Sequence, residues 1–397
     1  MIIKSVDAKA ILDSRKEKTI QVAIKTNAGN FSASAPNGKS VGKYETNPYK
    51  KSLDEDIKAL KKFSDYFSKE IIEKFEDLRR IEDVVDRQIG ANSLFALESA
   101  VLKAIAKEKR KEVWQIINPK ANKMSRLVGN VIGGGKHSKG YGEMNRKPDF
   151  QEFLLIPLSD SVLQSSNVNK DAKTDCLVIL KTVDDKFDGK KNDENAWQTS
   201  LDDKRVLEVL KDLVDNTFDE RELKLNIGVD LASSGFSKRK KYHYQNPLLD
   251  RTAEEQLSYI ENLIKNFNIF YIEDPFNEED FESFAKLLKR FPKSLIVGDD
   301  LTTTNVKRLE RAIEKKAING IIIKPNQIGS LLEVKKVVEL AKKNGIKIIF
   351  SHRSGETEED ILADLAFGFQ ADFFKCGIDG KEREAKIKRL IEIQKSL

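Results

Sequence analysis

The sequence of 397 residues contains little cysteine and little histidine. Its two cysteines, Cys176 and Cys376, are too few for a disulfide framework. It has no CxxC motif and no cysteine–histidine cluster, and its three histidines argue against a zinc site. This composition is typical of a protein kept in a reducing compartment, so we expect a cytoplasmic location.

The sequence also lacks long apolar runs and segments dominated by charge of one sign. No run approaches the roughly 18 apolar residues of a membrane span. The N-terminal MIIKSVDAKA lacks a signal peptide's apolar stretch, so we expect a soluble protein without a membrane partner. The 70 basic and 64 acidic residues are mixed along the chain, unlike the segregated basic face of a nucleic-acid binder. The densest basic run, 238–241, is more typical of a solvated loop than of a polyanion site.

The first 125 residues predict a small α+β domain. Ile20, Val22 and Ile24 alternate with polar residues, as in a half-buried strand, and a turn follows at 27–29. The pattern then changes to helical spacing, which is clearest in SLFALESAVLKAIAKEKRKEVWQII.

The remainder, 126–397, carries a different repeat. Six short apolar segments each end on a polar or charged residue, and the last five of these residues lie 23 to 28 residues apart. The six end residues are Asp230, Glu273, Asp299, Lys324, His352 and Lys375. Amphipathic helical stretches such as EVKKVVELAKKNG lie between most of the segments, which is typical of parallel βα units.

We expect these units to close into a (β/α)8 barrel. A barrel places its chemistry at the carboxyl ends of its strands, where these polar residues occur. An open sheet would concentrate polar strand ends near one switch point instead.

Three carboxylates, Asp230, Glu273 and Asp299, end three successive strands of this pattern. Neighbouring strands lie about 5 Å apart, so the three groups would converge and repel one another. A divalent cation relieves that repulsion, and an all-oxygen ligand set favours Mg²⁺ over Zn²⁺.

The next strand ends supply the other reactive groups. Lys324 would leave a buried strand beside the metal, where desolvation and nearby cations would lower its pKa and make it a base. His352, Arg353 and Ser354 together offer a phosphate cradle, and Lys375 adds a fixed cation. A metal, a base and anion clamps together predict proton abstraction next to a carboxylate.

A set of motifs spread in order over the whole chain resembles the enolase family. The motifs are ILDSR (11–15), PNGKSVGKYE (36–45), GGGKH (133–137), QEF (151–153), DE (193–194), GVDLASSGF (228–236), YIEDPF (271–276), VGDDLTTTN (297–305), KPNQIGSL (324–331), SHRSGET (351–357) and KCG (375–377). The last five of these motifs are dense and specific.

The resemblance implies reversible dehydration of 2-phosphoglycerate to phosphoenolpyruvate, with two Mg²⁺ ions per site. It makes Asp230, Glu273 and Asp299 the ligands of one ion and Ser40 a residue that helps to hold the second. It implies five catalytic groups: the base Lys324, the acid Glu194 with Glu152 beside it, the loop histidine His137, and His352. Arg353 and Ser354 would bind the phosphate, and Lys375 would face the substrate carboxylate. The family also implies a homodimer or a larger ring.

The motifs depart from the family at several loops. Lys16 replaces a glycine, the glycines flanking the acid are lost in 192–196, and SEF becomes SGF at 234–236. The stretch 138–150 is longer than usual, which predicts a lengthened lid. These changes leave substrate choice open, so a divergent superfamily lyase or racemase, or a silent binding paralogue, remains an alternative.

Three other patterns carry weaker signals. Gly38-Lys39-Ser40 resembles the end of a P-loop, but Ala33 stands where that motif needs glycine. The glycine run 133–135 predicts a hinge rather than a dinucleotide loop. His243 is interpreted as a surface imidazole.

Overall fold

The structure is a computed structural model that describes residues 1–39, 42–67, 70–142, 145–221 and 223–397. It begins with an antiparallel meander of β1 (Ile3–Leu12), β2 (Lys18–Thr26) and β3 (Gly29–Ser34). Ile20, Val22 and Ile24 on β2 are buried, which confirms the predicted alternation.

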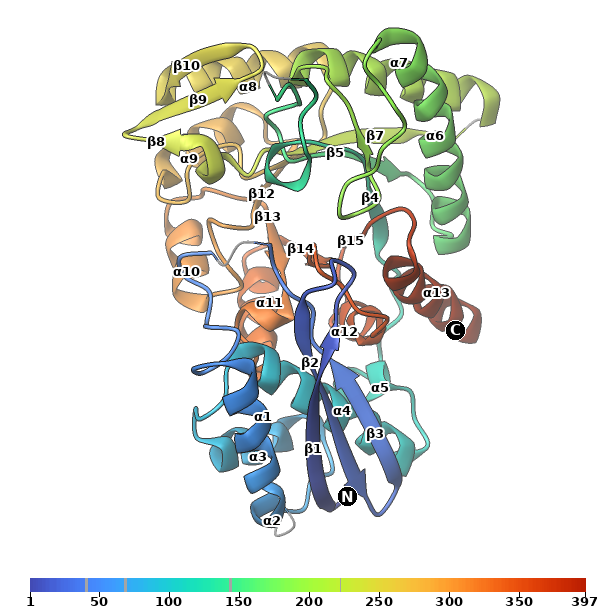
Figure 1. Cartoon of the computed structure of the whole chain (residues 1–397), viewed down its shortest axis with the longest axis vertical. Helices are drawn as coiled ribbons and strands as arrows, with labels where there is room; N and C mark the ends of the chain where they lie inside the picture. Colours follow the sequence, from blue (N-terminus) through green and yellow to red (C-terminus); the bar gives the residue numbers. More distant parts are fainter. Residues whose placement is uncertain (40–41, 68–69, 143–144, 222) are drawn as a thin grey trace.

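Helices cover one face of this meander. Those described are α1 (Leu53–Lys62), α2 (Ser64–Phe67), α3 (Leu78–Val85), α4 (Ala91–Lys109) and α5 (Val113–Ile117). Helix α4 packs against β2 and β3 and also against the 3-10 turn Pro325–Gln327 of the barrel, so it is buried on most sides. Figure 1 shows the meander with its helices at one end of the molecule and the barrel towards the other.

Eight described strands close into the expected barrel. They are β4 (Arg126–Gly133), β5 (Glu152–Pro157), β7 (Leu225–Asp230), β11 (Tyr271–Glu273), β12 (Leu295–Gly298), β13 (Gly320–Ile323), β14 (Lys347–Ser351) and β15 (Phe373–Lys375). The last strand pairs in parallel with the first, with Phe374 opposite Leu127. The six segments predicted from the sequence are β7 and β11 to β15. The division of the chain into 1–125 and 126–397 stays a prediction.

One strand departs from the simple βα repeat. Strand β5 runs antiparallel to both of its neighbours, β4 and β7. The connection from β4 to β5 holds no α-helix among its described residues, so the chain returns along the barrel in the opposite direction. Glu152, the first residue of β5, therefore lies opposite Asp230, the last residue of β7. The first residue of β5 therefore lies at the mouth of the barrel, beside residues that end the other strands.

The outer layer of the barrel is helical. It consists of α6 (Val162–Val183), α7 (Asp203–Arg221), α8 (Ala253–Phe267), α9 (Phe281–Arg290), α10 (Val306–Glu314), α11 (Leu331–Lys343), α12 (Ile361–Gly368) and α13 (Lys381–Ser396). Polar side chains cap the first turns of several of these helices. Thr252 and Glu255, for example, form a reciprocal capping box at the start of α8.

A small sheet is inserted between β7 and α8. It consists of β8 (Ser237–Lys238), β9 (Lys241–Gln245) and β10 (Leu248–Thr252). The basic run 238–241 forms its first turn and is exposed, as expected of a solvated loop. A short strand, β6 (Trp197–Gln198), pairs with the end of β4.

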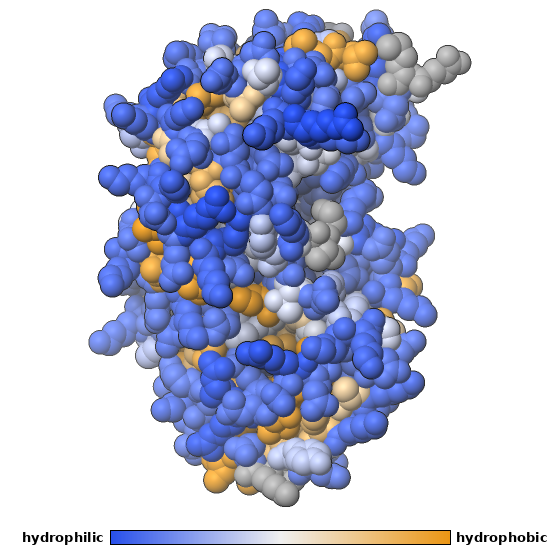
Figure 2. Space-filling view, turned by 90° about the vertical axis from the view of Figure 1, so that its left-hand side faces the viewer, coloured by the Kyte–Doolittle hydropathy of each residue, from blue (hydrophilic) through white to orange (hydrophobic). Residues whose placement is uncertain are grey.

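The surface is mainly polar. Figure 2 shows one face of the molecule, where hydrophilic residues predominate and apolar residues form small scattered groups. Among the described residues, no helix combines the length and apolar character that a membrane crossing requires.

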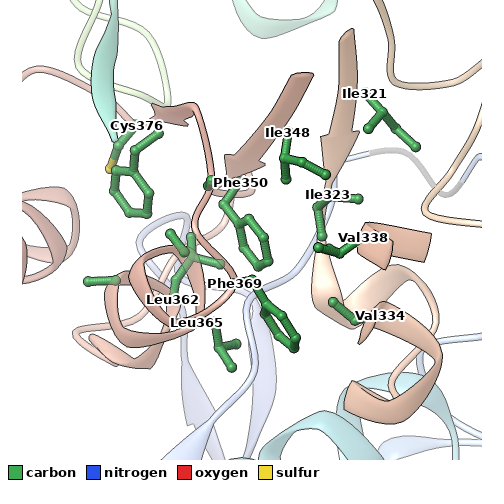
Figure 3. Close-up of a cluster of buried hydrophobic side chains, with 14 of the residues drawn as sticks. Ile321, Ile323, Val334, Val338, Ile348, Phe350, Leu362, Leu365, Phe369 and Cys376 are labelled. Carbon is green, nitrogen blue, oxygen red and sulfur yellow. The ribbon is translucent and has the colours of Figure 1, made fainter. Parts of the chain in front are cut away.

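Apolar residues fill both faces of the barrel strands, as their near-continuous apolar sequences predict. Ile322 and Ile349 belong to the cluster inside the barrel. Figure 3 shows the outward side of β13 and β14, where Ile323 and Phe350 pack towards α11 and α12. The rings of Phe350 and Phe369 stack with their centroids 5.9 Å apart. This packing fixes the strand ends and therefore the side chains at the mouth.

Candidate active site

The mouth of the barrel gathers buried carboxylates. Asp230 ends β7, Glu273 ends β11 and lies opposite Asp230, and Asp299 directly follows β12. Glu152 joins them from the antiparallel β5. All four are buried. Asp230 and Glu273 meet at Lys375, Asp299 lies closest to Asp274 and Asp300, and β5 adds a fourth acid.

Lys375 lies at the centre of this acidic group. Its Nζ is 3.0 Å from Asp230 Oδ2 and 2.8 Å from each of Glu273 Oε1 and Glu152 Oε2. Burial by itself lowers the pKa of Lys375, but the carboxylates of Asp230, Glu152 and Glu273 outweigh it and raise the pKa well above its usual range. The ammonium group is therefore a permanent counter-charge of the site.

The same carboxylates fit a divalent cation. Burial, together with the repulsion of neighbouring carboxylates, raises the pKa of Asp230 and of Glu273, so further positive charge would stabilise both groups. Asp299 Oδ1 is buried and has no hydrogen-bond partner among the described residues, which leaves it available as a ligand. Tyr271 donates a 2.6 Å hydrogen bond to Glu273 Oε2 and orients that carboxylate. An all-oxygen donor set of this kind suits Mg²⁺.

Further acidic groups lie beside these candidate ligands. Oxygen atoms of Asp274, Asp299 and Asp300 come within 4.8 Å of one another. Asp274 accepts the backbone N–H groups of Asp299 (3.1 Å) and Asp300 (2.6 Å), so it positions the loop after β12. Burial and the nearby Asp299 raise the pKa of Asp300 to about 7. The predicted ligand Ser40 lies outside the described residues.

Lys324 follows β13 and forms a buried ion pair with Asp299. Burial lowers the pKa of Lys324, but the charges of Asp299 and Glu273 together outweigh it, and the pKa lies above its ordinary value. The carboxylate directly beside the ammonium stabilises its charged form, so the lowered pKa expected of a metal-loaded site stays a prediction.

A second group of side chains faces the mouth from the side of β4 and β5. His137 Nδ1 lies 3.5 Å from Glu194 Oε1 and 3.7 Å from Glu152 Oε1. Asn130 donates a 3.0 Å hydrogen bond to Glu194 Oε2. Burial and then the charge of Glu194 raise the pKa of Glu152 to about 6. Burial lowers the pKa of His137 to about 4, so the imidazole is neutral at pH 7.

The altered segment 192–196 still presents Glu194 to this group. Asn192 Oδ1 accepts the backbone N–H groups of Glu194 (2.9 Å) and Ala196 (3.0 Å). Asn195 adopts a left-handed conformation with φ 64°, which asparagine tolerates better than most residues. An asparagine side chain and this turn thus replace the missing glycines in shaping the loop.

The segment after β14 supplies the cationic side of the site. Both terminal nitrogens of Arg353 bond Glu45, at 3.1 Å in the shortest contacts. Arg15 donates a 2.6 Å hydrogen bond to Ser354 Oγ. His352 Nε2 lies 3.9 Å from Glu194 Oε2. Burial, followed by the charges of surrounding basic residues, lowers the pKa of His352 well below its usual range, so this imidazole is also neutral.

These side chains share one cavity of about 600 Å³. Lys136, Lys147 and Lys238 line it, and so does His243. His243 is half-buried and bonds Asp250 at 2.7 Å, so its imidazole lies on the cavity wall as well as near the surface. The cavity brings together the described residues that the sequence analysis singled out for chemistry, except Glu273, which adjoins it through its contact with Lys375.

Several residues of the site had no assigned role in the sequence analysis. Asn130 and Tyr271 lie within apolar strands, and the only available signal was a polar group in an otherwise apolar run. Arg15 and Glu45 lie in recognised motifs, but only the structure reveals their contacts with Ser354 and Arg353. Gly134 packs closely rather than leaving an open hinge, since a Cβ there would come within 2.3 Å of Phe150 O.

The fold and this site define an α/β-barrel enzyme whose reactive groups meet at the mouth of the barrel. Residues 3–117 match the family model "Enolase, N-terminal domain", and residues 124–397 match "Enolase, C-terminal TIM barrel domain". The chain belongs to the enolase family, a family of lyases.

Curated relatives agree with this assignment. A protein named enolase from Pyrobaculum aerophilum is 37% identical over 91% of this chain and 87% of its own length. An enolase from Methanosphaera stadtmanae is 35% identical over 100% of this chain and 97% of its own. An enolase from Archaeoglobus fulgidus is 33% identical over 99% of this chain and 97% of its own length. The similarity therefore spans both parts of the chain.

Proposed function

We propose that this chain catalyses the reversible, Mg²⁺-dependent dehydration of 2-phosphoglycerate to phosphoenolpyruvate, the step that serves glycolysis and gluconeogenesis. The observation that carries the proposal is one cavity that holds a candidate base, candidate acids, carboxylate ligands and a phosphate clamp. The family membership supports the same reaction.

Asp230, Glu273 and Asp299 would hold one Mg²⁺, and Ser40 would help to hold a second. When bound, the cations neutralise the substrate carboxylate and so make the proton on C2 acidic enough to remove. Lys375 contributes a fixed positive charge on the same side. Asp299 would then bind metal instead of pairing with Lys324 alone, and the pKa of this lysine would fall towards that of a base.

Proton removal and loss of hydroxide would take place on opposite faces of the substrate. Lys324 follows β13 and Glu152 begins β5, and these strands lie four positions apart in either direction around the eight-stranded barrel. Lys324 would take the C2 proton, and Glu194 would protonate the leaving C3 hydroxyl with Glu152 and His137 beside it. The pKa of about 6 for Glu152 suits a group that shares a proton near neutral pH.

Arg353 and Ser354 would bind the phosphate, and this would require Arg353 to exchange its contacts with Glu45 for the substrate. His352 lies between the clamp and Glu194 and, being neutral, can donate or accept a hydrogen bond there. This clamp argues against an unphosphorylated substrate.

We also expect a homodimer or a larger ring of this chain, located in the cytoplasm, with a small phosphorylated metabolite as its partner. Light scattering coupled to size-exclusion chromatography measures the assembly directly. A monomer at micromolar concentration would contradict the expected oligomer and leave the catalytic proposal intact.

The central test is an assay of purified protein with 2-phosphoglycerate, followed by the absorbance of phosphoenolpyruvate. We expect turnover with Mg²⁺ and none after chelation with EDTA, restored by added Mg²⁺. Calorimetric titration of Mg²⁺ in the presence of substrate gives the number of ions bound. Absence of turnover over a range of pH and metals would favour another carboxylate substrate or a silent binding role.

A further inference from the structure

His137 lies in a short turn whose own hydrogen bonds all end on one atom: the carbonyl oxygen of Gly134 accepts the N–H groups of His137 (3.0 Å) and Ser138 (3.1 Å). It ends a single 3-10 turn, Gly135–His137, which follows directly after Gly134. Glycine has more conformational freedom than other residues, so contacts with neighbouring segments add to the restraint of this turn. The imidazole must nevertheless stay within 3.5 to 3.7 Å of Glu194 and Glu152.

Lys147 provides contacts on both sides of this turn. Its Nζ donates hydrogen bonds to the carbonyl oxygens of Gly135 (2.5 Å) and Ser138 (2.8 Å), which flank His137 in the chain. The side chain is half-buried, and no carboxylate of the described residues forms an ion pair with it. Hydrogen bonds from an ammonium to carbonyl oxygens are stronger than neutral ones. Lys147 is therefore committed to the backbone of the turn.

The chain around Lys147 is itself fastened to the inserted sheet. Asp149 accepts the backbone N–H groups of Gln245 and Asn246, both at 2.9 Å. The side-chain amide of Asn246 donates in return to the carbonyl oxygen of Lys147 at 3.2 Å. The carbonyl oxygen of Pro148 accepts the N–H of Gly135 at 2.9 Å. Lys147 thus connects a fixed support to the turn of His137.

We propose that Lys147 is a positioning residue that holds His137 in register with Glu194 and Glu152. The sequence predicts that 138–150 is a lengthened lid, whereas the described end of this stretch acts as a clamp on the histidine turn. The expected loss of rate rests on the proposed function, but the expected displacement of the His137 side chain does not. Misplacing a group in such a site by about 1 Å lowers the rate by as much as 10²-fold.

A direct role for Lys147 in substrate binding is the competing explanation, because the side chain lines the same cavity. The two explanations differ in their dependence on His137. A positioning residue has no further effect once His137 is removed, whereas a substrate-binding cation keeps its effect.

The first experiment observes the histidine without catalysis. The chain has three histidines, so the side-chain ¹⁵N spectrum of labelled full-length protein resolves His137 from His243 and His352. In Lys147→Met we expect the His137 signals to shift or broaden while those of the other two stay in place. Lys139→Met, on the same loop and exposed, is the matched control, and Lys147→Arg should restore the parent spectrum. An unchanged His137 signal in Lys147→Met overturns the proposal.

The second experiment is a double-mutant cycle on kcat and KM for 2-phosphoglycerate. We expect Lys147→Met to lower kcat about 10-fold or more with a smaller change in KM, and to change kcat less than 2-fold in a His137→Ala background. Equal effects in both backgrounds overturn the proposal in favour of direct substrate binding. If the parent chain shows no turnover, the proposed function fails. The ¹⁵N spectrum of the first experiment then shows by itself whether Lys147 positions His137. Lys147→Gln, which keeps one donor, replaces Lys147→Met in both experiments if thermal unfolding shows that the methionine variant does not fold.

Discussion

At the scale of single residues, the mouth of the barrel is governed by which cation lies next to which carboxylate. Lys375 is surrounded by Asp230, Glu152 and Glu273, whereas Lys324 pairs with Asp299. Both lysines pair with proposed metal ligands, but Lys375 has three carboxylate partners whereas Lys324 has the one ion pair with Asp299 among the described residues. Under the proposed function, this difference would keep Lys375 a fixed charge and let Lys324 act as a base once a metal engages Asp299.

Replacing Lys324 tests the base. We expect Lys324→Ala to reduce exchange of the C2 proton of 2-phosphoglycerate with solvent by about 10² to 10⁴-fold, because no other proton acceptor follows β13. Proton NMR in deuterated buffer measures the exchange. Lys324→Arg is the matched control: it keeps a cation beside Asp299 and should be equally inactive. Exchange at the parent rate in either variant would rule out Lys324 as the base.

Replacing Glu194 separates the two half-reactions. We expect Glu194→Gln to slow phosphoenolpyruvate formation by about 10²-fold or more, because the amide cannot protonate the leaving hydroxyl. Exchange at C2 should be largely preserved, since Lys324 lies on the opposite side of the barrel. Both rates are followed in one sample by NMR. An equal loss of both steps would show that Glu194 is not the acid.

At the scale of elements, the inserted sheet supports the wall of the site through one arginine. The Arg251 guanidinium on β10 lies 4.1 Å from the ring centroid of Tyr244 on β9 and 3.8 Å from that of Tyr259 on α8. The sheet also holds Asp149, and through it the segment that carries Lys147. The cation–π contacts therefore connect the insertion to the barrel.

Removing this guanidinium should loosen the insertion. We expect Arg251→Met to lower the free energy of unfolding by about 1 to 2 kcal/mol, the size of a partly desolvated cation–π pair. Urea denaturation followed by circular dichroism measures the change. Arg239→Met, in the exposed turn of the same sheet, should change stability by less than about 0.5 kcal/mol. A loss no larger for Arg251→Met than for this control would contradict the role given to Arg251.

Sequence patterns predicted the elements unevenly. The segments that became β11 to β15 are apolar runs followed by amphipathic helices at a regular spacing, and β7 is an apolar run that ends on a carboxylate in the same way. The antiparallel direction of β5 was not predicted, because an apolar run reads the same in either direction. Its effect on the site is large, since it places Glu152 rather than the far end of β5 beside Asp230.

At the scale of the whole molecule, a buried glutamate joins the N-terminal helices to the barrel. Glu98 on α4 accepts the backbone N–H of Leu331, the first residue of α11, at 2.7 Å. Its other oxygen is buried without a hydrogen-bond partner among the described residues. Burial, together with the charge of Glu82, raises the pKa of Glu98 well above its usual value.

This raised pKa predicts a pH-dependent stability. The unfolded chain loses the Glu98 proton near pH 4.5, whereas the folded chain retains it, so the contribution of this residue to stability is full below pH 4.5 and declines as the pH rises towards the folded pKa. The decline is up to about 1.4 kcal/mol per pH unit.

The variant Glu98→Gln should flatten this decline, because its amide stays neutral at every pH. We expect its stability relative to the parent chain to be higher at pH 8 than at pH 5, as measured by urea denaturation at both values. Glu339→Gln, at an exposed position of α11, should leave the difference between the two pH values unchanged. A parallel pH response in Glu98→Gln and the parent would show that Glu98 ionises freely in the folded chain.

By itself, the sequence determined the barrel and the residues that end its strands. A repeat of apolar runs and amphipathic helices is a local pattern. When its strands close into a barrel, the residues that end them, Asp230, Glu273, Asp299 and Lys324, lie at the same mouth. The tertiary structure alone decided the pairing of these groups: Lys375 among three carboxylates, Lys324 on Asp299, and Lys147 across the turn of His137. These contacts depend on distances of a few ångströms between segments far apart in the chain, and neither period nor composition records such distances.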